Sequence, residues 1–126
     1  MYRALTEITI VVHLAFIVFV VAGGILAWKH LWLIPAHLAA LAWAVYAEIS
    51  SGIVCPLTAI ENFFASRAGI TTYRGDFVAH YLVPIIYQEG LPLNWQHALA
   101  AVVVGLNVFI YASLLLRRRT LASKKA

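Results

Sequence analysis

Long apolar stretches that carry single ionisable residues constrain the fold of this chain more than any other feature. The sequence is 63% hydrophobic and only 11% charged over 126 residues, which leaves too few charges to cover a water-soluble globule of this size. A charged side chain at the centre of a bilayer costs about 2.5–3.5 kcal/mol or more unless it meets a partner or water, so such residues are candidates for function. The candidates are His13, His37, Glu48, His80 and His97.

The hydropathy pattern predicts four membrane spans in a single domain over residues 1–126. A helix rises about 1.5 Å per residue and needs about 20 apolar residues to cross a hydrocarbon core of about 30 Å. Pro56 and Gly69 bracket a shorter amphipathic segment, which is expected to lie along the membrane surface or to fold over the bundle. The predicted fold is an all-α, integral-membrane four-helix bundle. Its expected spans are residues 8–28, 35–54, 77–90 and 93–116, with the interfacial helix over residues 56–68.

The third predicted span is the weakest of the four. Residues 77–90 form a short apolar run that contains Pro84, so this segment could be tilted, kinked or re-entrant.

The distribution of basic residues predicts an orientation. With four spans, both termini lie on the same side as the loop after the second span, and of the nine basic residues only Lys29 lies opposite. The positive-inside rule places that side in the cytoplasm. We therefore expect a multi-pass protein of the bacterial inner membrane with both termini cytoplasmic.

The basic carboxyl terminus does not indicate nucleic-acid binding. Arg117, Arg118, Arg119, Lys124 and Lys125 follow an apolar run and lack the aromatic or glycine-rich interleaving of nucleic-acid-binding segments. The expected partners are the lipid bilayer and, for a membrane protein this small, a larger membrane complex.

Helix rise places three ionisable residues at a similar depth. His13, Glu48 and His80 each lie about four to six residues from the predicted cytoplasmic end of their segment. We take them, together with Glu61, as candidate ligands of a metal ion, because imidazole and carboxylate groups bind transition metals. Asp76 stands four residues before His80, where its carboxylate could accept the imidazole N–H. The residues expected around this site are Cys55, Asp76, Tyr81 and Asn107.

A second, smaller group lies near the opposite membrane boundary. His37 and His97 are each about three residues inside the predicted outer ends of their spans. Bis-histidine ligation of haem would pair His13 with His80 and His37 with His97.

Three functions are compatible with these residues. The first is a site for haem or a transition-metal ion, although the sequence has none of the closely spaced ligand motifs that are diagnostic of metals. The second is an accessory or scaffold subunit, in which buried histidine and asparagine form hydrogen bonds between helices. The third is a relay for protons or a small solute. The pattern identifies no reaction, so it leaves open whether the protein is an enzyme.

The middle of the chain resembles a family of short bacterial membrane proteins that is known only as a domain of unknown function. The resemblance rests on Cys55-Pro56-Leu57-Thr58, the following Glu61, and the later pair His80-Tyr81 after Phe77. It implies a four-span inner-membrane protein and carries no mechanism. The shared pattern extends from Thr6 to Tyr111 and includes Gly69, Tyr73, Gly75, His13 and His37.

Overall fold

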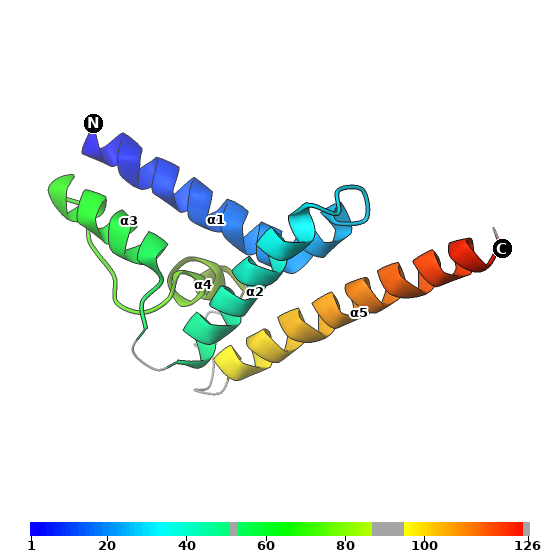
Figure 1. Ribbon diagram of the computed structural model, residues 1–126. Helices are drawn as coiled ribbons and strands as arrows, with labels where there is room; N and C mark the ends of the chain where they lie inside the picture. The colour runs from blue at the N-terminus through cyan, green and yellow to red at the C-terminus, as the bar shows by residue number, and fades with distance from the viewer. Residues whose placement is uncertain (51–52, 87–94, 125–126) are drawn as a thin grey trace.

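The computed structural model describes residues 1–50, 53–86 and 95–124, and every regular element in these ranges is a helix (Figure 1). The all-α class is therefore confirmed. The elements are α1 (Tyr2–Leu26), α2 (Leu33–Ile49), α3 (Pro56–Arg67), the π-helical turn η1 (Val78–Leu82), α4 (Val83–Ile86) and α5 (Trp95–Ser123).

Two of these helices, α1 with 25 residues and α5 with 29, are long and apolar enough to cross a membrane. α2 is also apolar and has 17 residues, the lower limit of what a span needs. Four spans are thus not confirmed. Residues 87–94, which include the end of the expected third span, lie outside the described part of the chain.

The boundaries of α2 and α3 follow from local backbone constraints. α2 ends at Ile49, five residues before its predicted end, because Ser50 already adopts an extended conformation. Pro56 then occupies the first turn of α3, where its missing N–H has no cost. Gly69 has a φ of +70°, the left-handed conformation expected of a residue that ends a helix.

The amphipathic helix α3 packs along the amino-terminal half of α1 (Figure 1). Small side chains make this close packing possible: Thr6 and Thr9 of α1 and Thr58 and Ala65 of α3 are all buried. Each α1 threonine donates its hydroxyl to the carbonyl four residues earlier, so neither brings an unsatisfied polar group to the contact. Of the two expected positions of the amphipathic helix, along the membrane surface or folded over the bundle, α3 adopts the second.

The segment before Pro84 forms a wider helical turn than an α-helix. A proline lacks the N–H that would bond to the carbonyl four residues earlier, and its ring would clash with that carbonyl. The π-helical turn Val78–Leu82 directly precedes Pro84 and gives the ring room. Over residues 77–86 the helix rises only about 15 Å, half the thickness of a bilayer core.

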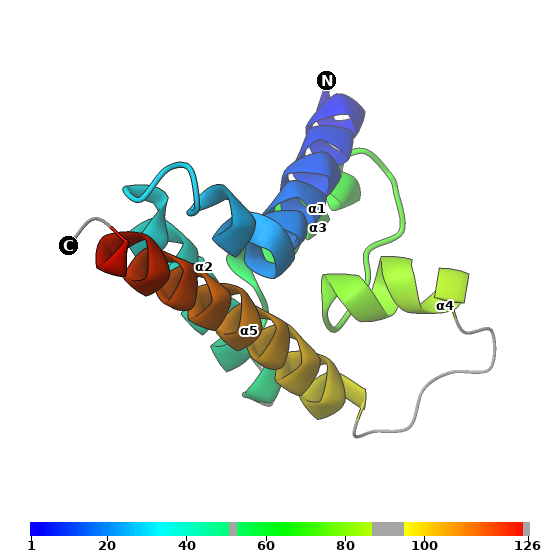
Figure 2. The same cartoon turned by 90° about the vertical axis from the view of Figure 1, so that its right-hand side faces the viewer.

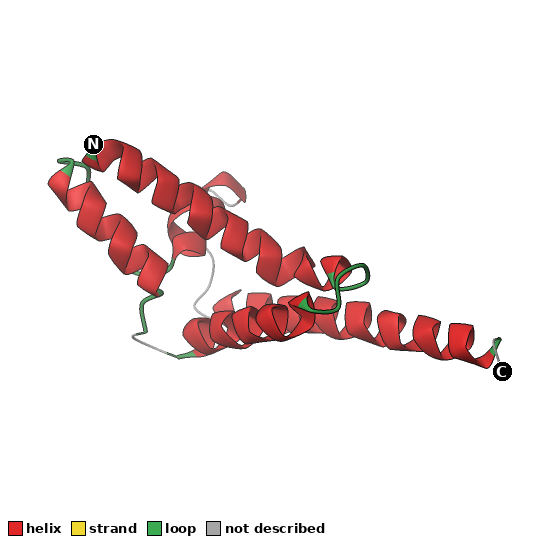
Figure 3. Ribbon diagram, turned by 45° about the horizontal axis from the view of Figure 1, so that its top comes forward, coloured by secondary structure: helices red, strands yellow, loops and turns green. Residues whose placement is uncertain are grey.

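The three longest helices alternate in direction. α1 and α2 are joined by the turn at residues 27–32, and α5 packs against both while running in the same sense as α1 (Figures 1 and 3). Turned by 90°, the molecule shows α5 crossing α2, with η1 and α4 beside α1 and α3 (Figure 2). The two ends of the chain consequently lie at opposite ends of the molecule.

The side chains are sorted in the reverse of the pattern in a water-soluble protein. Large apolar residues cover the outside of α1 and α5, among them Val11, Val18, Val102 and Phe109. The largest side chains that are almost wholly buried are instead polar or ionisable: His37, Glu61, Asn107 and Thr58. Such an apolar exterior around buried polar groups is what a lipid environment favours.

One backbone carbonyl joins α1, α2 and α5. Val20 O of α1 lies 3.2 Å from His37 Nε2 of α2 and 3.1 Å from Asn107 Nδ2 of α5. A carbonyl only accepts hydrogen bonds, so Nε2 carries a proton and donates it to Val20 O, while Nδ1 is hydrogen-bonded to the Tyr111 hydroxyl at 2.8 Å. We call these four residues the three-helix junction.

Glycine lets the helices approach at this junction. A Cβ atom added to Gly23 would lie 2.5 Å from His37 Cδ2 and 2.9 Å from the Phe19 ring. His37 has no space to withdraw, because its side chain is wholly buried.

We expect Gly23→Ala to destabilise the protein, because the new methyl group would displace His37 from Val20 O. Overpacking of this kind costs about 1–3 kcal/mol. Gly105→Ala in α5 is the matched control: nothing lies within 4 Å of its added Cβ, and alanine is the better helix former. Thermal unfolding in detergent, followed by circular dichroism, measures both variants. Equal midpoints for Gly23→Ala and the wild type would contradict the proposed packing.

Candidate functional site

A cavity of about 540 Å³ lies between α1, α2, the start of α5 and the η1 segment. Its wall is predominantly apolar and includes Phe16, Ile17, Trp43, Leu99 and Val103. Four side chains that can titrate also line it: His13, Glu48, Cys55 and Asp76. The cavity therefore contains both members of the predicted site that come from α1 and α2.

His13 and Glu48 carry the polar atoms that this cavity leaves unused. The His13 side chain is 4% exposed, and its ring packs at 4.2 Å against the Phe77 ring. Within the described residues, His13 Nδ1 and Glu48 Oε1 are buried and have no hydrogen-bond partner. A buried polar group without a partner costs about 1–3 kcal/mol, so both atoms can gain from a ligand that supplies one.

Asp76 is occupied by its own structural contacts. Its Oδ1 accepts the backbone N–H of Ala79 at 2.7 Å, in the manner of a helix cap, and its Oδ2 accepts Gln96 Nε2 at 2.8 Å. The carboxylate therefore orients the start of the η1 segment and ties it to α5. The expected hydrogen bond from the His80 imidazole N–H to the Asp76 carboxylate is not formed.

His80 points away from the cavity. Its side chain is exposed, and its ring stacks face to face on Tyr73, with centroids 3.9 Å apart and planes 4° apart. It is not among the cavity-lining residues that the structure describes. The structure thus does not bring His80 together with His13 and Glu48.

Glu61 belongs to a separate polar cluster. Its side chain is 1% exposed, and its two carboxylate oxygens accept the hydroxyls of Tyr81, at 2.6 Å, and Tyr73, at 3.1 Å. Asn62 adds two hydrogen bonds to the backbone of Tyr73. These contacts fasten α3 to the segment that follows it, so Glu61 and Tyr81 connect elements of the fold and do not line the cavity.

His37, Asn107 and His97 are likewise outside the cavity. His37 and Asn107 belong to the three-helix junction, where their polar groups bind Val20 O and Tyr111. His97 is exposed near the start of α5. It precedes Tyr111, the α5 partner of His37, by 14 residues, which corresponds to about 21 Å of helix. The pair proposed for haem is therefore not assembled.

The described residues 1–50, 53–86 and 95–124 contain no group of three His, Cys, Asp or Glu side chains that could hold a metal ion. The metal set expected from depth alone is distributed over three places: the cavity for His13 and Glu48, the Tyr73 stack for His80, and the tyrosine cluster for Glu61. This arrangement lends no support to a metal or haem centre.

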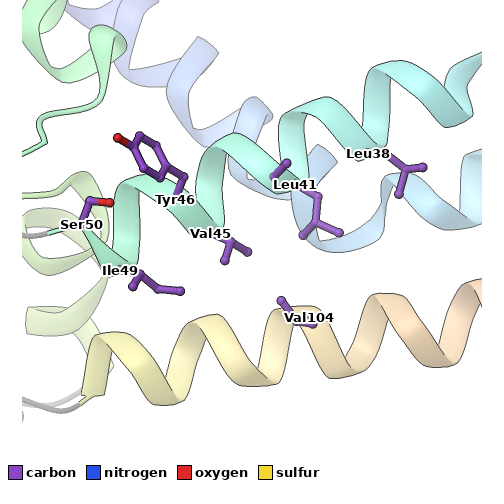
Figure 4. A pocket seen from close by; sticks show the side chains of 8 residues that line it. Leu38, Leu41, Val45, Tyr46, Ile49, Ser50 and Val104 are labelled. Carbon is purple, nitrogen blue, oxygen red and sulfur yellow. The ribbon is translucent and has the colours of Figure 1, made fainter.

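A second hollow, of about 580 Å³, lies along the outer faces of α2 and α5 (Figure 4). Apart from the Tyr46 and Ser50 hydroxyls, its described lining is apolar and comes from Leu38, Leu41, Val45 and their neighbours. Its described lining has no charged group and no buried polar atom without a partner, so it resembles a groove for lipid chains more than a chemical site.

Sequence reasoning missed the positioning roles of Tyr73, Phe77 and Gln96. Tyr73 and Phe77 appear in the family pattern, but nothing in their spacing indicates a contact with Glu61 or His13. Gln96 lies 20 residues after its partner Asp76. Correlated substitutions at positions 76 and 96 among related sequences are the kind of signal that could indicate this contact.

The sequence pattern of a protein family described as "Protein of Unknown function (DUF2784)" matches residues 3–112. This match confirms the resemblance to an uncharacterised family and assigns no activity. Neither the curated proteins nor the solved structures contain a match to the chain.

The tyrosine cluster predicts a loss of stability at alkaline pH. Burial, and then the Glu61 carboxylate, raise the pKa of Tyr73, which lies in the loop after α3. Above about pH 10, the ordinary tyrosine pKa, the unfolded chain loses a proton that the folded chain keeps, so the free energy of unfolding falls as pH rises. We expect Tyr73→Phe to lessen this fall, as measured by thermal unfolding in detergent at several pH values.

Tyr46→Phe is the control for this experiment. Tyr46 is 54% exposed, and its side-chain hydroxyl makes no hydrogen bond to the described residues. Its variant should retain the alkaline loss in full. An unchanged loss in Tyr73→Phe would show that Tyr73 does not carry the effect.

Proposed function

We propose that this chain, which belongs to the DUF2784 family, is an integral membrane protein that binds a small, largely apolar ligand in the cavity and holds the ligand's polar group with His13 and Glu48. The observation that carries the proposal is the pair of buried, unpartnered atoms, His13 Nδ1 and Glu48 Oε1, in a predominantly apolar cavity. As part of the proposal we place the protein in the bacterial inner membrane.

The cavity favours one class of ligand. Its volume of about 540 Å³ lies within the range of about 300–1,000 Å³ that is typical of small-molecule sites. The apolar wall suits a hydrocarbon or aromatic body. The carboxyl group of Glu48 and the imidazole of His13 on this wall suit a ligand with a hydroxyl or an amine, because these groups can donate a hydrogen bond to a carboxylate or exchange one with an imidazole.

Such a ligand can reach the site from the bilayer. The cavity is bounded by helices whose outer surfaces are apolar. A molecule that already partitions into lipid can enter the cavity directly from the bilayer without first passing into water. This route supports a lipid-soluble ligand over a water-soluble one.

The test is to identify what the protein carries when it is purified in detergent. Organic extraction followed by mass spectrometry should recover a lipid-soluble compound in near-stoichiometric amount from the wild type. Ala47→Phe places a ring in the cavity and should abolish recovery, because Ala47 lines it. Ala42→Phe, the same change on the outer face of the same helix, should not.

His13→Leu keeps the apolar contacts and removes the polar partner. We expect it to lower recovery about tenfold, which corresponds to about 1.4 kcal/mol of binding free energy. His80→Ala should leave recovery unchanged, because His80 does not line the cavity. Equal recovery from His13→Leu and the wild type would contradict the assigned role of His13.

A visible spectrum and a metal assay on the same preparation separate this proposal from the metal and haem hypotheses. A Soret band would show that the protein binds haem instead of the proposed ligand. A stoichiometric metal ion that is lost in Glu48→Gln would show that it binds a metal ion instead. Association with a larger membrane complex stays a prediction, and co-purification of a stable partner would be its evidence.

A further inference from the structure

The end of α2 and the start of α5 lie at the same end of the molecule. Glu48 from the last turn of α2, and Trp95 and Leu99 from the first turns of α5, line the same cavity. The chain between them, which includes α3, η1 and α4, therefore starts and finishes at that end. It makes no net crossing between α2 and α5.

The carboxyl end of α5 lies beside the α1–α2 turn. The Arg117 guanidinium stands 5.7 Å from the centre of the Trp28 ring, and Tyr111 binds His37 near the start of α2. α5 thus runs parallel to α1, as Figures 1 and 3 also show. If α1, α2 and α5 cross the membrane, they make three passes, and the two chain ends face opposite sides.

Basic residues are concentrated at one of the two ends. The end formed by the α1–α2 turn and the carboxyl end of α5, which we call the basic end, carries Lys29, Arg117, Arg118, Arg119 and Lys124. In the sequence, residues 27–36 and 112–126 include no Asp or Glu. The positive charge of this end is therefore uncompensated.

The other end is nearly balanced in charge. Arg3 pairs with Glu7 at 3.5 Å, and Arg67 leans over the Phe63 ring at 4.7 Å. Arg74 is the remaining described basic residue there, and the described acidic residues Glu7, Glu48, Glu61 and Asp76 all lie outside the basic end. Because short basic segments are retained in the cytoplasm, the difference between the two ends favours a cytoplasmic basic end.

From this arrangement we propose that the basic end is a cytoplasmic surface for anionic lipid headgroups, and that the amino terminus lies on the opposite side of the membrane. Trp28 and Trp32 place amphipathic rings at the level of the headgroups, and arginine forms bidentate hydrogen bonds with phosphate. Each basic residue near an anionic membrane surface adds to the electrostatic attraction between protein and membrane, and this attraction falls off within the Debye length.

Cysteine labelling tests the orientation in cells that express the full chain. Ala4→Cys and Ser123→Cys introduce thiols at exposed positions near the two ends without altering a charge, and the wild type reports the background from Cys55. A membrane-impermeant maleimide should label Ala4→Cys in intact spheroplasts, and Ser123→Cys only after permeabilisation. Labelling of both positions from the same side would overturn the proposed orientation.

Thermal unfolding in detergent, with added phosphatidylglycerol or phosphatidylcholine, tests the lipid surface. Phosphatidylglycerol should raise the unfolding midpoint of the wild type more than phosphatidylcholine does. This difference should vanish at about 1 M salt, where the Debye length is about 3 Å. It should also vanish in the triple variant Arg117→Gln, Arg118→Gln, Arg119→Gln.

Ala4→Cys, which keeps all basic residues, is the matched control and should keep the full difference. An equal response of the wild type to the two lipids would overturn the headgroup site. Neither experiment depends on the cavity ligand, so failure here and failure of the proposed function can be told apart.

Discussion

The Val20 carbonyl, which accepts hydrogen bonds from two other helices, holds the structure together. Helices in lipid gain little from burying apolar side chains against one another, because the surrounding acyl chains are equally apolar. Association depends instead on close backbone approach and on polar contacts between helices. At the three-helix junction, Gly23 supplies the approach, while His37 and Asn107 supply the contacts.

The geometry of the junction also determines what lines the cavity. His13 precedes Val20 by two helical turns, Glu48 follows His37 by about three turns, and Ala100 precedes Asn107 by two. Each helix therefore presents the same face at the junction and at the cavity. Where the faces are close, they form hydrogen bonds; where they diverge, they enclose the cavity and its two unpartnered polar atoms.

The sequence predicted the helical class, and it placed His13 and Glu48 at the depth where both now line one cavity. It misplaced His80 because depth along a helix says nothing about direction around it. The π-helical turn before Pro84 changes that direction, and the Tyr73 ring then covers the histidine. His97 lies far from His37 because α5 runs in the same direction as α1, whereas the predicted third crossing before α5 would have reversed that direction.

The reversed sorting of polar and apolar side chains separates the residues that hold the fold from those that meet the solvent. Val11, Val18 and Phe109 face outward and take no part in the junction, whose strength comes from backbone and amide contacts. Replacing such outward residues with glutamate and lysine would change the medium in which the helices dissolve while leaving their mutual contacts intact. The architecture is accordingly a candidate for conversion into a water-soluble analogue with the same interior.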